Sequence, residues 1–254
     1  MRKLYVIGIG AGDPDQVTVQ AVKAMRRTDV FFLIGKGAGK QELADVRATI
    51  VAEYADQPHR MVQIPDPPRD RSVPGTGADT AYRGVVEDWH EARAALLEQA
   101  FAETDGAGAI LVWGDPSLYD STLRVVERVI ERGRVGFDYE VIPGITSVQA
   151  LAAAHRMVLH EIGEPLHITT GRRLRDEGLA SGQSTLVMLD SDCSFTQVPG
   201  DDIYIWWGAY LGMPDETVIE GPLRIVEGRI TRRRAALREA KGWIMDTYLL
   251  RRNG

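Results

Sequence analysis

Three glycine-containing loops carry the residue types that hold small ligands. They are residues 8–14 (GIGAGDP), 114–119 (GDPSLY) and 143–147 (PGITS), and each follows a predicted strand. Short apolar runs such as 109–113 are typical of buried strands in parallel sheets, and open α/β sheets bind ligands at the carboxyl ends of their strands. A single Gly-Asp-Pro turn is more often a plain strand-to-helix connection. Three such loops in one chain favour a ligand site.

The first loop departs from a dinucleotide-binding fingerprint. Counting from Gly8 and Gly10, the third glycine of that pattern falls at the position of Asp13. Asp13 and Asp15 would repel a pyrophosphate resting on a helix amino terminus. We therefore expect the loop to approach a neutral or cationic ligand, or another loop of the chain.

Two arginine clusters are candidates for recognising an acidic substrate. Arg69 and Arg71 lie in a segment, residues 65–77, that has four prolines and two glycines. Arg172 and Arg173 follow a predicted strand at 166–170. A guanidinium binds a carboxylate through two parallel hydrogen bonds. The alternative is that both clusters are solvated surface charge.

Alternating apolar and amphipathic segments predict an α/β fold with mainly parallel or mixed sheets. The predicted strands are 4–7, 29–34, 59–64, 109–113, 137–142, 166–170, 185–189, 203–207 and 242–250. A chain of 254 residues has room for two domains. We predict an N-terminal α/β domain over 1–116 and a C-terminal α/β domain over 117–254, with the ligand loops in a cleft between them.

Composition narrows the possible classes of protein. The net charge of −6 argues against nucleic-acid binding, which requires a basic surface. No apolar run approaches the roughly 18 residues of a membrane span, and residues 1–3 lead directly into a predicted strand, which leaves no room for a signal peptide. The single cysteine, Cys193, excludes an intrachain disulfide and a cysteine-built metal site. We expect a cytoplasmic protein without a metal, a membrane partner or a nucleic-acid partner.

In order and spacing, the three loops resemble those of the tetrapyrrole (corrin/porphyrin) methylases, and the resemblance covers essentially the whole chain. One departure is Ala11, where family members usually carry proline. Within the family, residues 112–123, 168–173 and 242–250 resemble the deacetylating branch. The resemblance implies a class III methyltransferase fold of two α/β domains with an interdomain cleft, usually assembled as a homodimer.

The function that this resemblance implies is C-methylation in cobalamin (corrin ring) biosynthesis. The donor is S-adenosyl-L-methionine (SAM), which leaves as S-adenosyl-L-homocysteine, and the tetrapyrrole substrate is precorrin-5, methylated at ring carbon 1 with release of acetate to give precorrin-6A. By motif position, SAM would contact Gly114, Asp115, Leu118, Thr146, Ser147, Leu189, Asp190, Ala209 and Tyr210. Candidates for contact with the substrate are Gly10, Asp13, Arg69, Arg71, Arg172 and Arg173.

The chemistry of these residues is compatible with that function. SAM is a sulfonium cation, so a carboxylate such as Asp115 is tolerable near it. Release of acetate could use a general base, for which His155, His160 and Asp13 are weak candidates, because packing or capping is the commoner role of such residues. We assign no catalytic residue. The alternatives are another precorrin or uroporphyrinogen methylase of the same family, or a nucleotide-binding α/β regulatory module.

Overall fold

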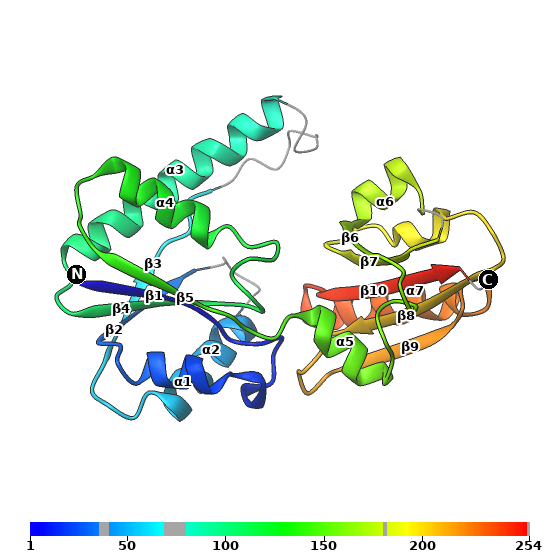
Figure 1. Ribbon diagram of the computed structural model, residues 1–254, viewed down its shortest axis with the longest axis horizontal. Helices are drawn as coiled ribbons and strands as arrows, with labels where there is room; N and C mark the ends of the chain where they lie inside the picture. Colours follow the sequence, from blue (N-terminus) through cyan, green and yellow to red (C-terminus); the bar gives the residue numbers. More distant parts are fainter. Residues whose placement is uncertain (36–40, 69–79, 180–181, 253–254) are drawn as a thin grey trace. The chain divides into compact units, whose positions relative to one another are not determined.

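The chain forms two compact units, each built on its own five-stranded sheet (Figure 1). The structure is a computed structural model that describes residues 1–35, 41–68, 80–179 and 182–252. The first unit comprises Met1–Gly10 and Pro14–Gly144, and the second comprises Ala11–Asp13 and Ile145–Gly254. None of the helices in the described ranges is both long enough and apolar enough to cross a bilayer.

The sheet of the first unit is parallel throughout, with strand order β3-β2-β4-β1-β5. Its helices cover both faces, α1 and α2 on one and α3 and α4 on the other (Figure 1). The strands are β1 (Lys3–Gly8), β2 (Val30–Ile34), β3 (Arg60–Ile64), β4 (Ala107–Val112) and β5 (Asp138–Ile142), and the helices are α1 (Val19–Met25), α2 (Gln41–Tyr54), α3 (Thr80–Ala102) and α4 (Thr122–Arg132).

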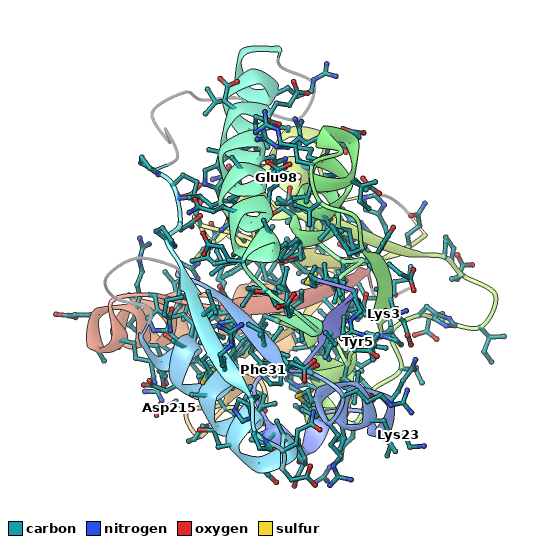
Figure 2. All side chains as sticks on the ribbon, turned by 90° about the vertical axis from the view of Figure 1, so that its left-hand side faces the viewer. Lys3, Tyr5, Lys23, Phe31, Glu98 and Asp215 are labelled. Atoms are coloured by element: carbon teal, nitrogen blue, oxygen red, sulfur yellow. The ribbon has the colours of Figure 1, made fainter. Side chains whose placement is uncertain are left out.

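Alternation along the strands divides the core of this unit between the two faces. In β1, Leu4 and Val6 pack with residues of α3 and α4. Tyr5 and Ile7 point the other way, into a cluster that includes Phe31 and residues of α1 and α2; Tyr5 and Phe31 are labelled in Figure 2. Because both faces are covered, the three central strands β2, β4 and β1 read as almost continuous apolar runs, as the sequence predicts.

The second unit has a mixed sheet with strand order β6-β7-β10-β8-β9. Strands β6 and β7 are parallel, and β10 is antiparallel to both of its neighbours, β7 and β8. Consequently β6, β7 and β8 all end at the edge where β10 begins. The strands are β6 (Leu166–Thr170), β7 (Ser184–Met188), β8 (Ile203–Ala209), β9 (Thr217–Pro222) and β10 (Asp246–Arg252), and the helices are α5 (Ser147–His155), α6 (Gly171–Glu177) and α7 (Leu223–Lys241).

The units divide after Gly144, not at the predicted boundary between 116 and 117. The physical reason is that α4 and β5 complete the first unit: β5 pairs along β1, and α4 contributes Val125, Val126 and Val129 to the same core as β1. Residues 11–13 belong to the second unit, where a Cβ on Gly12 would lie 2.5 Å from the Met213 side chain.

Three glycines pack backbone against backbone where β1, β4 and β5 end. Gly8 ends β1, which lies between β4 and β5 in the sheet. A Cβ on Gly8 would lie 2.6 Å from the nitrogen of Gly144 and 2.7 Å from the carbonyl oxygen of Gly114. A Cβ on Gly144 would overlap the same Gly114 oxygen. The three sequence motifs therefore meet in the first unit, and only glycine permits their approach.

This contact predicts that Gly144→Ala destabilises the protein while Gly136→Ala does not. At Gly144 the new methyl group meets backbone that cannot rotate away, whereas nothing lies within 4 Å of a Cβ on Gly136. Overpacking of this kind costs roughly 1–3 kcal/mol, which lowers the melting temperature by several degrees. Thermal unfolding followed by circular dichroism measures the difference. Equal melting temperatures for the two variants would show that the loops do not depend on this contact.

Candidate functional site

The loop after β4 is held in shape by the carboxylate of Asp115. One carboxylate oxygen accepts hydrogen bonds from the Ser117 backbone N–H, at 2.8 Å, and from the Ser117 hydroxyl. The other accepts from the backbone N–H of Gly144 at 2.9 Å. The Asp115 carboxylate thus connects the second motif to the start of the third, and its hydrogen bonds stabilise the conformation of the loop.

These hydrogen bonds set the ionisation state of Asp115. Partial burial acts to raise the pKa of the carboxyl group, but the hydrogen bonds from Ser117 and from the Gly144 N–H outweigh it and lower the pKa below its usual value. The group is therefore ionised at neutral pH, and three hydrogen-bond donors stabilise its negative charge.

The loop after β4 also contacts the first motif, and the side chain of Tyr119 at its end is exposed. The N–H of Gly114 donates to the carbonyl of Gly10 at 2.8 Å, and the N–H of Leu118 donates to the carbonyl of Asp115 at 3.2 Å. Leu118 is half-buried. Tyr119 is exposed and has a positive φ of 52°, a conformation that is uncommon outside glycine and concentrates at functional sites.

In the second unit, the ends of β6, β7 and β8 bring together several of the predicted residues. Leu189 and Asp190 follow β7, and Tyr210 follows Ala209, the last residue of β8. Leu189 has a φ of 54° and its apolar side chain is 66% exposed. Tyr210 has a φ of 51° and is buried, its hydroxyl donating to the carbonyl of Trp243 at 2.6 Å. Both residues that follow these strand ends, exposed Leu189 and buried Tyr210, therefore have left-handed backbone conformations.

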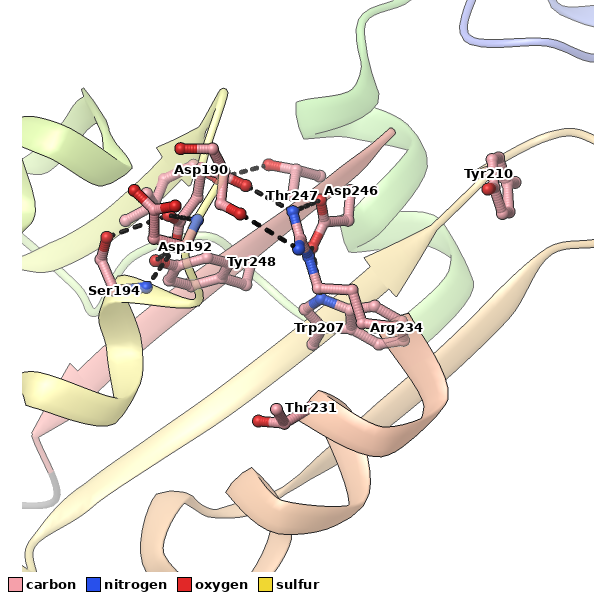
Figure 3. Close-up of polar contacts among 12 residues, drawn as sticks. Asp190, Asp192, Ser194, Trp207, Tyr210, Thr231, Arg234, Asp246, Thr247 and Tyr248 are labelled. Carbon is pink, nitrogen blue, oxygen red and sulfur yellow. Dashed lines mark hydrogen bonds and ion pairs between the residues drawn. The ribbon is translucent and has the colours of Figure 1, made fainter. Parts of the chain in front are cut away.

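The buried carboxylate of Asp190 is satisfied from all sides (Figure 3). It accepts hydrogen bonds from the N–H and the hydroxyl of Ser194, at 2.7 and 2.9 Å, from the N–H of Asp192 at 3.0 Å and from the hydroxyl of Tyr248 at 2.6 Å. Burial and the Asp190 charge raise the pKa of Tyr248 well above its usual value, so the phenol keeps its proton and remains a donor. Asp190, like Asp115, holds its own loop.

Arg234 of α7 holds the backbone of the turn after β7 through hydrogen bonds (Figure 3). Its guanidinium donates to the carbonyls of Asp190, at 2.6 Å, and of Ser191, at 3.3 Å. It also forms a buried ion pair with Asp246 at 2.8 Å, and Asp246 accepts from the Trp207 indole N–H at 2.9 Å. The turn after β7 and the start of β10 therefore share one buried cation.

Thr146 and Ser147 begin α5 in the second unit. The Thr146 hydroxyl accepts from the N–H of Val148 at 3.1 Å, and the Gln149 side chain accepts from the N–H of Thr146. This reciprocal capping box accounts for the polar side chain of Thr146. Whether either residue also meets a ligand stays a prediction.

The proposed substrate contacts are only partly described. Arg69 and Arg71 lie outside the described residues. Arg172 and Arg173 lie in the first turn of α6, at the same edge as Leu189, and Arg173 pairs with Glu177 at 3.5 Å. Gly10 belongs to the first unit and Asp13 to the second.

The two histidines that the sequence offers as general bases are held by neighbouring groups. The His155 ring is bonded to the Glu220 carboxylate at 3.0 Å and to the Trp207 carbonyl at 3.1 Å, and its side chain is only 3% exposed. Exposed His160 is bonded to the neighbouring Glu161 carbonyl. Packing and local hydrogen bonding explain both rings.

The first unit also contains a pocket of about 470 Å³ that the motifs do not predict. Its lining includes the ends of β2 and β4, the segment 119–122, and side chains from three helices. These are Arg47 of α2, Val86, Trp89, His90 and Arg93 of α3, and Arg124 of α4. The four α3 positions have the spacing i, i+3, i+4 and i+7 of one helix face. That spacing is visible in the sequence, but without the structure the face cannot be distinguished from an ordinary core-facing one.

The comparisons with known proteins agree with this geometry. The family model of the tetrapyrrole (corrin/porphyrin) methylases matches residues 3–226, and the chain belongs to that family.

The chain is similar to curated proteins and to several solved structures. The chain is 48% identical to precorrin-6A synthase [deacetylating] of Sinorhizobium sp, over 99% of this chain and 96% of that protein. A cobalamin synthesis related protein from Corynebacterium diphtheriae has a similar structure, with a TM-score of 0.82, 37% identity and 99% of both chains covered. The uroporphyrin-III C-methyltransferase of Thermus thermophilus, solved with S-adenosyl homocysteine, shares the fold with a TM-score of 0.58, 16% identity, and 98% of this chain and 91% of that one covered.

The role of Asp115 predicts a pH-dependent effect of Asp115→Asn on stability. A carboxyl group whose pKa is lowered by folding contributes stability above its unfolded value of about 3.9, and this contribution is lost as the pH falls through the lower folded value. The variant should therefore melt below the wild type at pH 7. The gap should shrink at pH 3, below the unfolded value, because protonation of the carboxyl group in the unfolded chain removes part of this contribution. Melting curves at the two pH values test this, and a gap that does not change with pH would contradict it.

The role of Arg234 predicts a large loss of stability in Arg234→Met. The substitution leaves Asp246 as a buried carboxylate without its cation, which costs roughly 3–5 kcal/mol. Arg233→Met is the matched control, because the Arg233 side chain is exposed and, among the described residues, bonds only to the Thr217 hydroxyl, at 3.4 Å. Chemical denaturation gives both free energies of unfolding. A change of similar size in the two variants would rule out a special role for the buried pair.

Proposed function

We propose that this protein is a SAM-dependent C-methyltransferase of cobalamin biosynthesis that converts precorrin-5 to precorrin-6A with release of acetate. The observation that carries the proposal is the meeting of the three motif loops at the carboxyl edge of the first sheet, in a chain with 48% identity to a deacetylating precorrin-6A synthase. Open α/β sheets bind small ligands at this edge.

The residues at the two sheet edges fit SAM better than a phosphate-rich cofactor. The carboxylates of Asp115 and Asp190 are engaged within their loops, and their negative charge would oppose a pyrophosphate. Leu189 presents an exposed aliphatic surface in a left-handed turn, which suits the flat apolar face of an adenine. The residues that would hold SAM are Gly114, Asp115, Leu118, Thr146, Ser147, Leu189, Asp190, Ala209 and Tyr210. When bound, SAM supplies an electrophilic methyl group.

The proposed reaction balances without an external oxidant or reductant. Water attacks the acetyl carbonyl, the bond between that carbon and the macrocycle breaks, and the electron pair stays on the macrocycle. An electron pair of the macrocycle then forms the new bond to the methyl group, so the two bond changes balance. Acetate and two protons leave. The chain has to position the macrocycle, exclude stray water and accept a proton, all of which depend on placement.

Assembly as a homodimer and a cytoplasmic location belong to the same proposal. The dimer is supported by the family resemblance and by exposed apolar side chains between α5 and β6, among them Val158 and Ile162. The location is supported by the presence of only one cysteine in 254 residues. The proposed substrate surface includes Gly10, Asp13, Arg172 and Arg173, with Arg69 and Arg71.

Incubation of the purified protein with precorrin-5 and SAM carrying a ¹³C-methyl group tests the proposal. We expect one methyl group transferred to the macrocycle and one acetate released per turnover, followed by NMR. Calorimetric titration with S-adenosylhomocysteine and with NAD accompanies it. Methylation without acetate, or of another precorrin only, would favour a different methylase of the family. Binding of NAD but not of S-adenosylhomocysteine would favour a nucleotide-binding module.

A further inference from the structure

Arg47 brings a cation without a counter-ion to the wall of the pocket in the first unit. Its Nε donates to the carbonyl of Leu111 at 3.3 Å, and its Nη1 donates to the carbonyl of Leu43 at 2.9 Å. A guanidinium has five N–H donors, so three have no acceptor among the described residues. No carboxylate of the described residues lies within ion-pair distance of Arg47.

The surroundings of Arg47 desolvate its charge without neutralising it. Burial lowers the pKa of the guanidinium, and the only nearby charge that acts to raise it is the carboxylate of Asp120. Asp120 does not lie within ion-pair distance of Arg47, and one of its carboxylate oxygens accepts the N–H of Thr122 at 2.6 Å at the start of α4. Arginine normally pairs when it is removed from water. An unpaired guanidinium at a pocket wall is therefore suited to bind an anionic ligand, which would neutralise its charge.

A second arginine of the pocket, Arg93, is paired with a carboxylate, in contrast to Arg47. Arg93 donates to the Asp66 carboxylate at 2.7 Å and stacks on the Trp89 ring at 3.8 Å. Its charge is thereby balanced within the protein. Arg124 also lines the pocket, and no described carboxylate pairs with it. Three arginines and two aspartates line the pocket, so it has an excess of positive charge in a protein whose net charge is −6.

We propose that Arg47 binds a carboxylate of the tetrapyrrole substrate in this pocket. The inference rests on the proposed function for the identity of the ligand and on the unpaired guanidinium for the place of contact. The pocket opens beside segment 119–122, directly after the Gly-Asp-Pro loop at the end of β4. Its volume of about 470 Å³ accommodates a carboxylate-bearing edge of a large ligand. The planar fork of arginine suits a carboxylate, which it binds bidentately.

The test compares Arg47→Met and Arg47→Lys with the wild type and with Arg128→Met. Arg128 is the matched control because it is an arginine of α4 outside the pocket lining that pairs with Glu91 at 3.6 Å. We expect Arg47→Met to raise the KM for precorrin-5 by roughly tenfold or more, since hydrogen bonds to charged groups are the strong ones. Arg47→Lys should fall between, and kcat and the affinity for S-adenosylhomocysteine should stay within about twofold. Arg128→Met should match the wild type.

A second measurement separates this inference from the proposed reaction. Binding of uroporphyrin, a stable polycarboxylated tetrapyrrole, is followed by fluorescence quenching in the same four proteins. If the wild type does not convert precorrin-5, the proposed function fails, and weaker uroporphyrin binding by the Arg47 variants alone would still support the carboxylate site. An unchanged KM in folded Arg47→Met, or equal uroporphyrin binding by all four proteins, overturns the inference. If Arg47→Met does not fold, Arg47→Lys decides by the same readouts.

Discussion

Backbone packing against backbone at Gly8, Gly114 and Gly144 is the constraint on which the first unit depends. β1 lies between β4 and β5, so their carboxyl ends arrive at neighbouring positions of one edge. Side chains at Gly8 and Gly144 would force the strand ends apart, because a Cβ at either position would meet the carbonyl oxygen of Gly114. Helices α1 and α4 then leave toward opposite faces from the adjacent strands β1 and β4 (Figure 1), and this divergence opens an edge where ligands bind in such sheets.

Carboxylates hold the loops of both units in place. Asp115 joins the loop after β4 to Gly144, and Asp190 gathers donors from Ser194 and Tyr248 under the turn after β7. Each is followed or preceded by a residue in a strained, left-handed conformation with an exposed side chain, Tyr119 or Leu189. Because hydrogen bonds within each unit hold these carboxylates in place, the rigid loops can present backbone groups and apolar surface to a neutral or cationic ligand.

Much of this was predictable from local sequence, and the rest depends on pairing between distant segments. The strands of the first sheet follow from short apolar runs, and the structure confirms them. The boundary after Gly144 depends on the pairing of β5 with β1, which no local pattern records. Strand β9 and helix α7 were not predicted. A ligand-binding role for Arg47 was not predicted, because an arginine on a helix is ordinarily a solvated charge.

The most direct test of this account is amide hydrogen exchange, measured by mass spectrometry with and without S-adenosylhomocysteine. If the motif loops hold the cofactor, exchange should slow in peptides that cover 112–119, 143–147, 189–190 and 209–210. The exposed face of α7 should exchange as before. Binding of S-adenosylhomocysteine that leaves exchange in these loops unchanged, and slows it elsewhere, would contradict the assignment of the cofactor site to the ends of the strands.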